Sequence, residues 1–470
     1  MLSSRRDFLR RSSTFAAGFC ALRHCLVSPA LANSTPSIAP YGPLGLDPNG
    51  ILDLPQGFTY RVISTSGSTM SDGLITPGLP DGMATFAGPD ELTMLVRNHE
   101  LLPFEGPGAF GKMNELFGKV DPQKLYDRGK GQFPHRGGTS TIVYDTKNQK
   151  VVRDFMSLAG TSRNCAGGPT PWNSWITCEE TVIRSGPGTD GEYFCDHDHG
   201  YCFEVFASAN NAVSPVPLKA MGRFVHEAIA VDRKKGVVYL TEDANSAGFY
   251  RFLPKRNKRL AEGGVLQILK IKEQDAYDTR KGQKTGMSFM ANWVTISNPD
   301  PIEADLDPLA VYKEGLAKGA ATFARLEGIW ADKKGRMYFD ATSGGDAKAG
   351  QIWLYESINK DEGRLTLLFE SPSRQILDMP DNICLHPKND LLFICEDSDY
   401  AELGGKPDNF IRILTKDGKI ADFAKNVAEK KESSEFAGSV FSKDGKILFV
   451  NLQTVGSTFA IWGDWQAFRK

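Results

Sequence analysis

Long hydrophobic runs and sustained helical periodicity are scarce in this chain of 470 residues. The apolar run near the N-terminus is interrupted by Arg23 and His24, and no later run is long enough for a membrane-spanning helix. A large excess of one charge is also absent, since 55 Lys and Arg face 57 Asp and Glu, a formal net charge of −2. A nucleic-acid partner would require a basic patch. We therefore expect neither a membrane span nor nucleic-acid binding.

The first 32 residues have the pattern of an export signal. Ser4-Arg5-Arg6-Asp7-Phe8-Leu9-Arg10 is a twin-arginine motif, and a short apolar run leads from it to a small-residue cleavage site at Ala30-Leu31-Ala32. Twin-arginine export carries folded proteins, which suits a protein that receives its cofactor in the cytoplasm. We expect residues 1–32 to bind the twin-arginine export machinery and to be cleaved off before Asn33, leaving one monomeric domain, 33–470, in the periplasm or secreted.

Six cysteines remain after that cleavage, and some of them should pair in an oxidising compartment. Cys195 and Cys202 bracket a short Asp-His-Asp-His-Gly loop and suggest a local disulfide, although Cys195, His197, His199 and Cys202 could alternatively bind zinc. Cys384 and Cys395 flank a turn with a spacing typical of cross-strand neighbours. Cys165 has no local mate, so its thiol is the one available for chemistry.

The 47 glycines and 26 prolines separate short apolar runs, a pattern typical of an all-β protein. A unit of strand, charged turn, strand and acid recurs imperfectly along the chain. Its copies are residues 230–243, 330–340, 385–397 and 441–451, with looser relatives at 92–100 and 163–180. One small antiparallel sheet cannot bury both faces alone, and closure into a ring solves this problem. We predict a six-bladed β-propeller with insertions, the largest at 254–320 and ending in a helix from Leu309 to Lys318.

Acidic residues recur at fixed places in these units. One lies at the start of each predicted innermost strand and another at the end of the next strand, which puts both at the same end of a blade. Around a ring they would converge on one mouth: Glu179, Glu180, Glu227, Glu242, Asp243, Glu327, Asp381, Glu396 and Glu435. Carboxylates this close repel one another strongly unless cations lie between them. The set predicts calcium sites, with Cys165 recruiting a softer transition metal.

Each of these residues also has a structural explanation. Acids are common at strand ends, and a buried cysteine is ordinary. Arg163 and Arg325 could bind phosphate oxygens beside metals or simply neutralise the acids. His99 and His226 could shuttle protons or be hydrogen-bonded core residues.

Several motifs, in this order, resemble the PhoX-type alkaline phosphatases: Asn-Cys-Ala-Gly-Gly from Asn164, Thr-Cys-Glu-Glu from Thr177, His-Glu-Ala from His226, Ala-Arg-Leu-Glu-Gly from Ala324 and Pro-Asp-Asn from Pro380. The resemblance implies a six-bladed propeller whose axial site holds a pair of ferric ions and several calcium ions around an oxo group. It also implies hydrolysis of phosphomonoesters. Carried across, Cys165 would bind iron, the acids above would supply the other ligands, and Arg325 and Asn164 would hold the phosphoryl oxygens.

We therefore expect an extracytoplasmic alkaline phosphatase. No serine or threonine lies in a recognisable nucleophile context, which favours a metal-borne nucleophile over a covalent intermediate. The alternatives are a calcium-dependent propeller lactonase or esterase, or a non-catalytic propeller with structural calcium. Neither alternative would need Cys165 or the arginines.

Overall fold

The computed structural model describes residues 40–188, 193–398, 408–428 and 434–466. All of the described strands and helices belong to one compact unit, Ala39–Lys470. The predicted signal at residues 1–32 lies outside the described residues. Among those residues, no helix is both long and apolar enough to cross a membrane.

Antiparallel strands dominate this unit, as the glycine- and proline-punctuated sequence predicts. Four sheets are built from strands that are close together in the sequence. The first contains β4 (Pro80–Ala87), β5 (Thr93–His99), β6 (Gly137–Asp145) and β7 (Lys150–Thr161), and the second contains β8 (Asn164–Pro169), β9 (Ser174–Glu179) and β12 (Cys202–Phe206), while β10 (Gly186–Pro187) and β11 (Phe194–Cys195) form a small pair. The fourth has nine strands: β13 (His226–Val231), β14 (Val238–Glu242), β15 (Tyr250–Pro254), β16 (Gly264–Ile271), β17 (Ser288–Thr295), β18 (Ile329–Ala331), β19 (Met337–Ala341), β20 (Gln351–Ser357) and β21 (Gly363–Glu370).

Two further sheets combine the two ends of the described chain. One contains β1 (Leu44–Gly45), β2 (Leu52–Pro55), β22 (Pro380–Leu385), β23 (Leu392–Glu396), β24 (Phe410–Leu414) and β25 (Ile420–Asn426); the other contains β3 (Thr59–Thr65), β26 (Phe436–Phe441), β27 (Ile447–Leu452) and β28 (Ser457–Trp462). Helices are few: α2 (Gly129–Gln132), α3 (Ala310–Ala317) and the 3₁₀ turns η1 (Pro89–Glu91), η2 (Phe117–Lys119), η3 (Pro122–Lys124), η4 (Lys219–Met221) and η5 (Leu260–Glu262).

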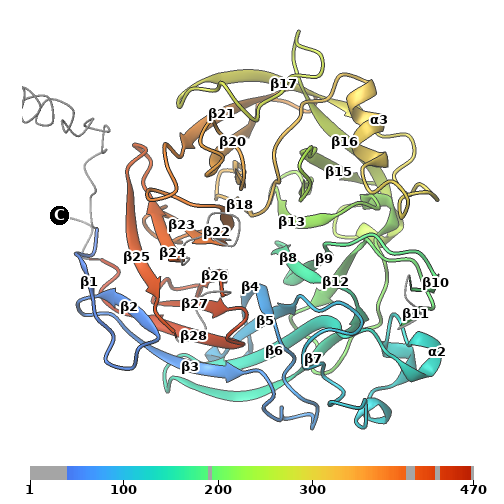
Figure 1. Cartoon of the computed structure of the whole chain (residues 1–470), viewed down its shortest axis with the longest axis vertical. Coiled ribbons are helices and arrows are strands. Elements are labelled where there is room, and N and C mark those ends of the chain that lie inside the picture. The colour runs from blue at the N-terminus through green and yellow to red at the C-terminus, as the bar shows by residue number, and fades with distance from the viewer. Residues whose placement is uncertain (1–39, 189–192, 399–407, 429–433, 467–470) are drawn as a thin grey trace, which may run out of the picture. The chain divides into compact units, whose positions relative to one another are not determined.

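The sheets surround a common centre, in a propeller-like arrangement (Figure 1). The all-β prediction is confirmed, but the hydrogen bonding does not divide the described strands into six separate blades. β17 pairs with both β16 and β21 and so joins β13–β16 and β18–β21 into the nine-stranded sheet. The predicted insertion at 254–320 supplies β16 and β17, and its predicted helix is α3. The insertion therefore contributes two strands to the nine-stranded sheet.

Pairing of β28 with β3 closes the ring between the two ends of this unit (Figure 1). Phe459 lies opposite Val62, and Trp462 lies opposite Thr59. Without β3, β28 would have an unpaired edge, a site at which other chains can add strands. The aromatic cluster of Tyr41, Phe58 and Trp465 packs beside this junction.

One backbone hydrogen bond recurs six times around the centre. The amide nitrogens of Glu100, Glu180, Asp243, Thr342, Asp397 and Gln453 donate to the carbonyl oxygens of Leu79, Arg163, Val225, Arg325, Met379 and Glu435, in that order, at 2.8–3.3 Å. Each bond joins the start of an inner strand to the loop after the next strand. The position two residues after each acceptor is here called the axial position. The axial positions are occupied by Asp81, Cys165, Glu227, Glu327, Asp381 and Ala437.

The backbone at the axial positions is irregular in the same way in most units. Leu79, Arg163, Arg325 and Met379 have φ values of 43–48°, in the left-handed region that non-glycine residues rarely adopt. The strand register then shifts just past the axial residue, as between Pro80 and Met83. The same shift follows Asn164, His226, Pro380 and Ala437. Such bulges re-aim side chains and are typical of functional sites.

Candidate metal centre and phosphate site

The inner strands approach one another very closely at the centre. A Cβ atom on Gly438, where φ is +65°, would lie 2.4 Å from the carbonyl oxygen of Asp81, and one on Gly328 would lie 2.3 Å from that of Asp381. Only glycine fits such contacts. The residues that follow the six axial positions line one small cavity of about 30 Å³. The axial side chains therefore come from all around the ring to one place.

Cys165, Glu180 and Glu227 form the first of three groups that could bind a cation there. Their ligand atoms all lie within 4.8 Å of one another, and all three residues are buried. The Cys165 thiol is free, as predicted, and its Sγ lies 3.4 Å from the carbonyl oxygen of His226. Burial, together with Glu227 and Glu180, raises the pKa of this thiol well above its ordinary value. A bound cation would reverse that effect, because metals bind the thiolate.

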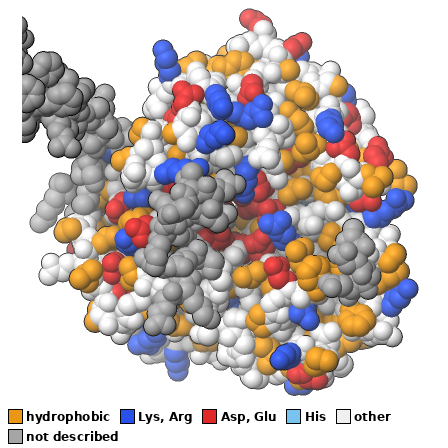
Figure 2. Space-filling view, viewed as in Figure 1, with side chains coloured by type: hydrophobic (Ala, Val, Ile, Leu, Met, Phe, Trp, Pro, Cys, Tyr) orange, Lys and Arg blue, Asp and Glu red, His pale blue; other side chains and the backbone are white. Residues whose placement is uncertain are grey.

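Two further groups contain carboxylates alone. Glu227, Glu327 and Asp381 form one, and Asp81, Glu100 and Glu435 form the other, again with ligand atoms within 4.8 Å. Glu227 belongs to both the first and the second group. Glu227 therefore links the first two groups, and Asp81 of the third group is close enough to raise the pKa of Cys165 and of Asp381, so the three groups form one centre. Acidic side chains are visible near the middle of the face shown in Figure 2.

The electrostatics of this centre favour bound cations. Burial raises the pKa of Glu227 well above its ordinary value, and the neighbouring Glu327 and Glu180 raise it further. Burial also raises the pKa of Glu327 and Asp381. Asp81 Oδ1 is buried, and none of the described residues donates a hydrogen bond to it. These carboxylates can therefore ionise together only if compensating positive charge lies between them.

Pairs of adjacent residues explain which acids reach the centre. In Glu179-Glu180, Glu242-Asp243 and Glu396-Asp397 the first residue ends a strand and the second makes the recurring backbone bond. Successive side chains of an extended chain point to opposite sides. The second member can therefore face the centre, while the first points back into its own sheet.

The first members of these pairs bind the protein rather than the centre. Glu179 accepts hydrogen bonds from the backbone N–H groups of Ser162, Gly200 and Tyr201, and Glu242 accepts from Gly248 N–H and the Tyr250 hydroxyl. Glu396 forms an ion pair with Arg412, with Nε 2.7 Å from Oε1. Burial raises the pKa of Glu242 and of Glu396 to about 7. None of the three belongs to the cation groups found among the described residues.

Arg325 and Arg163 lie at the rim of the centre. Arg325 donates from Nε and Nη2 to both oxygens of Asp243, at 2.9 and 2.8 Å, and from Nη2 to Glu327 at 2.7 Å. Arg163 Nε lies 2.8 Å from Glu100 and 3.3 Å from Glu180. The side chains of Arg163 and Arg325 are 42% and 28% exposed, whereas those of Glu180 and Glu327 are 8% exposed. The guanidinium groups therefore lie between the acids and the solvent.

Asn164 is turned away from this rim. Its amide donates to the Thr177 hydroxyl at 2.9 Å and accepts from the Thr161 hydroxyl at 2.7 Å, and the residue is fully buried. The two histidines considered as proton shuttles are also bound within the protein. His99 is hydrogen-bonded to Gly78 and Ser140, and His226 contacts the carbonyl oxygen of Gly222.

The cysteine pairing predicted from sequence is wrong. All six cysteines of the described residues are free. Cys202 lies opposite Cys178 on β9, at 3.6 Å between the sulfurs, while Cys195 lies 3.4 Å from His135 Nε2. Cys384 and Cys395 lie on adjacent strands, but Cys384 pairs with Phe393. The alternative of zinc bound by Cys195, His197, His199 and Cys202 is also wrong, because Cys202 and His197 are outside the cluster containing the other two.

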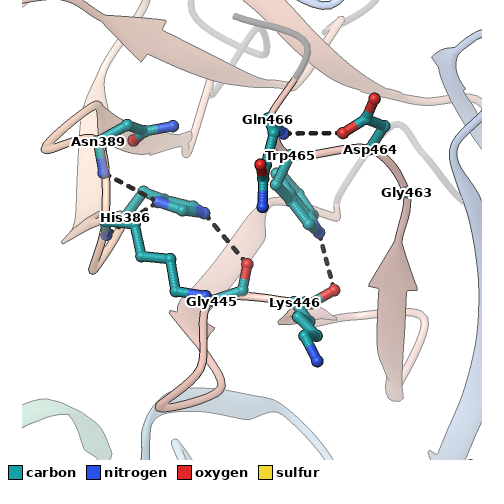
Figure 3. Close-up of a pocket in the computed structure, with 9 residues that line it drawn as sticks. His386, Asn389, Gly445, Lys446, Gly463, Asp464, Trp465 and Gln466 are labelled. Atoms are coloured by element: carbon teal, nitrogen blue, oxygen red, sulfur yellow. Dashed lines mark hydrogen bonds between the residues drawn. The ribbon is translucent and has the colours of Figure 1, made fainter. Parts of the chain in front are cut away.

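A separate cavity of about 230 Å³ lies near the C-terminal strand (Figure 3). His386 contacts the carbonyl oxygen of Gly445 there, and Trp465 donates to that of Lys446. None of the axial acids lines this cavity. These contacts fasten both the turn between β22 and β23 and the segment around Trp465 to the turn between β26 and β27.

Sequence reasoning missed three acids of the centre: Asp81, Glu100 and Asp397. Asp81 and Glu100 belong to a cation group, and Asp397 follows Glu396 as Glu180 follows Glu179. The signal for Asp81 was available, because Pro80-Asp81-Gly82 parallels Pro380-Asp381-Asn382.

Comparison with known proteins agrees with this geometry. The family model for alkaline phosphatase PhoX matches residues 39–456. A solved structure of Pseudomonas fluorescens PhoX in complex with vanadate, a transition state analogue, has a TM-score of 0.66 at 18% identity, covering 91% of this chain and 97% of that one. A gluconolactonase from Xanthomonas campestris has a TM-score of 0.35 at 10% identity, covering 91% and 99%, too low a score for any inference.

A search of the curated proteins found no match. The family match nevertheless spans most of the chain, including every residue of the three cation groups. This chain belongs to the PhoX alkaline phosphatase family.

Proposed function

We propose that this protein hydrolyses phosphomonoesters outside the cytoplasm, with the substrate bound over the axial centre. The observation that carries the proposal is the convergence of Cys165, Glu180 and Glu227 within 4.8 Å, directly beside Arg163. A propeller that used calcium only for stability would need neither the buried sulfur nor the arginines at its rim.

The ligand atoms in each group indicate which cation that group would bind. Cys165 offers a soft ligand, so the group of Cys165, Glu180 and Glu227 would hold a transition metal, with iron expected from the family resemblance. The two carboxylate groups suit calcium, which prefers hard oxygen ligands. Glu227 would be shared between a transition metal and a calcium ion, and a second ferric ion would have to draw on the same acids.

Bound cations would supply the Lewis acidity that neutralises a phosphate ester and lowers the pKa of a water molecule. The chain itself would orient the ester. Arg163 and Arg325 are partly exposed and permanently charged, and a guanidinium fork matches two phosphoryl oxygens. Both now compensate acids of the centre. With those acids neutralised by cations, the guanidinium groups can turn to the substrate.

Asn164 has a different role in this proposal. Its amide is occupied by Thr161 and Thr177, so it holds the strand start that carries Cys165 in place. Phosphoryl binding would then rest on the two arginines.

We also infer six blades from the recurring backbone bond. Its six copies fall at regular places, and two of them, at Asp243 and Thr342, lie within the nine-stranded sheet. That sheet would then be two blades joined through β17. Export by the twin-arginine route and a monomeric state belong to the same proposal.

The test compares Cys165→Ala with the wild-type chain, each exported by its own signal. We expect the variant to lose iron and aryl phosphate hydrolysis together, and calcium chelation to inactivate the wild type. Cys384→Ala is the matched control, because it removes another buried free thiol that lies outside the cation groups. Full hydrolysis by folded Cys165→Ala protein, or hydrolysis indifferent to chelation, would refute the proposal.

A further inference from the structure

A second cluster of metal-binding side chains lies away from the axial centre. Asp127, His135, Cys195 and His199 each offer one ligand atom, and these four atoms lie within 4.8 Å of one another. All four residues are at most 1% exposed. Asp127 and His135 flank α2, while Cys195 and His199 come from the segment around β11, and α2 and β11 lie together at the outer edge of the ring in Figure 1.

The distances between the side-chain atoms of this cluster are close to those between the ligand atoms of a tetrahedral metal ion. Cys195 Sγ lies 3.4 Å from His135 Nε2, His199 Nε2 lies 3.2 Å from Asp127 Oδ2, and His135 Nε2 lies 3.7 Å from Asp127 Oδ1. Ligand atoms about 2.0–2.3 Å from a tetrahedral zinc ion are roughly 3.3–3.8 Å apart. The Nε2 atoms of both imidazoles lie beside the Asp127 carboxylate, and the two rings are stacked with their centroids 4.5 Å apart.

The atoms behind the ligands are arranged as they are behind zinc-binding histidines. His135 Nδ1 lies 2.6 Å from the Ser162 hydroxyl, and His199 Nδ1 lies 2.6 Å from Glu179 Oε1. Such partners fix the ring orientation and leave the Nε2 lone pair for the metal. Asp127 is held in turn by the backbone N–H groups of Gly129 and His197.

Hydrogen bonds join these atoms only in pairs, His135 Nε2 with Cys195 Sγ at 3.4 Å and His199 Nε2 with Asp127 Oδ2 at 3.2 Å. Between the two pairs, His135 Nε2 lies 3.7 Å from Asp127 Oδ1, beyond hydrogen-bond length. A sulfur, two imidazole nitrogens and one carboxylate oxygen form a donor set that suits zinc.

We propose that Asp127, His135, Cys195 and His199 bind one structural Zn²⁺ ion, separate from the cations of the axial centre. The site supplies four protein ligands and is buried, so it is closed to substrate, as structural zinc sites are. It fastens the 127–135 segment to the 195–199 segment. Through His135 and Ser162 it also holds the residue that precedes Arg163.

The test uses the full chain, metal-depleted and reloaded with Zn²⁺ or with Co²⁺ as a spectroscopic probe. Cys165→Ser serves as the background, because it removes the only other thiol that belongs to a cation group among the described residues. We expect this background to bind one Zn²⁺ per chain at the second cluster. We also expect it to show a thiolate-to-cobalt charge-transfer band. Adding Cys195→Ser should abolish both the band and one zinc equivalent, whereas adding Cys384→Ser should change neither.

A measurement that needs no variant in the cluster guards against misfolding. X-ray absorption at the zinc edge of the Cys165→Ser protein should report one sulfur and two imidazole ligands, and the axial groups contain no imidazole. Unchanged zinc content in folded Cys195→Ser,Cys165→Ser protein, or a zinc spectrum without imidazole and sulfur, would overturn the proposal. Because no readout is hydrolysis, this result is independent of the phosphatase test.

Discussion

Arg325 donates two parallel hydrogen bonds to Asp243, from Nε to Oδ1 at 2.9 Å and from Nη2 to Oδ2 at 2.8 Å. The planar fork of a guanidinium makes this geometry, and the ammonium of lysine cannot. The same fork is what a phosphoryl group would require.

Replacing Arg325 by lysine should therefore impair hydrolysis although the charge is kept. We expect kcat/KM for an aryl phosphate to fall by roughly 10²-fold, the size typical of losing one transition-state donor. Arg280→Lys is the control, since Arg280 donates a similar pair of hydrogen bonds to Asp278 outside the centre. Equal activity of Arg325→Lys and wild type would show that the fork does not touch the substrate.

Adjacent glutamates on one strand end should respond in opposite ways to the same substitution. Glu180→Gln removes a ligand from the group of Cys165 and Glu227, so we expect loss of bound metal and activity. Glu179→Gln weakens contacts to three backbone N–H groups and His199, so we expect a lower melting temperature. Bound metal, kinetic constants and melting temperature are to be measured for both variants. If the two variants behaved alike, the inference that Glu180 faces the centre and Glu179 points into its own sheet would be wrong.

Metal-free protein should lose stability as the pH rises. The pKa values of Glu227, Glu327 and Asp381 are raised in the folded state, mainly by burial. An acid of this kind destabilises the native state when ionised, beginning once the pH exceeds the unfolded value of about 4 and growing toward the folded pKa. Glu242 and Glu396, with pKa values of about 7, add to the decline up to that pH.

Thermal unfolding of chelator-treated protein at pH 5.5 and pH 8 measures this effect. We expect the melting temperature to be lower at pH 8 and to recover there when Ca²⁺ is added. A metal-free protein that is equally stable at both values would mean that the acids are not buried together.

Gly438→Ala should be unusually costly. Alanine in the left-handed region costs about 1–2 kcal/mol, and here its Cβ would also lie 2.4 Å from the Asp81 carbonyl oxygen, adding ~1–3 kcal/mol of overpacking. Gly57→Ala is the matched control, since its φ is +88° and nothing lies within 4 Å. Denaturant unfolding should separate the two variants, and equal losses would rule out the close approach.

The sequence was informative about the fold because the repeat of strand, turn, strand and acid is local. It also predicted Cys165, Glu180, Glu227, Glu327, Asp381 and Glu435, which the structure places in cation groups. It could not separate Glu179 from Glu180, because both fit the pattern and only the strand's alternation decides which one faces the centre. The partners of Cys195 were beyond reach for another reason. Spacing suggested His197 and Cys202 nearby, whereas Asp127 and His135 arrive from 60 or more positions earlier.

The junction between β28 and β3 has a consequence for biosynthesis. Thr59 and Trp462 become neighbours only after all of the chain between them has left the ribosome. Contacts between residues so distant along the chain form slowly, because a large loop must close first. Pairing of β28 with β3 is thus a late step in folding, and a nascent chain stalled before Ser457 would leave the edge of β3 unpaired and open to other chains.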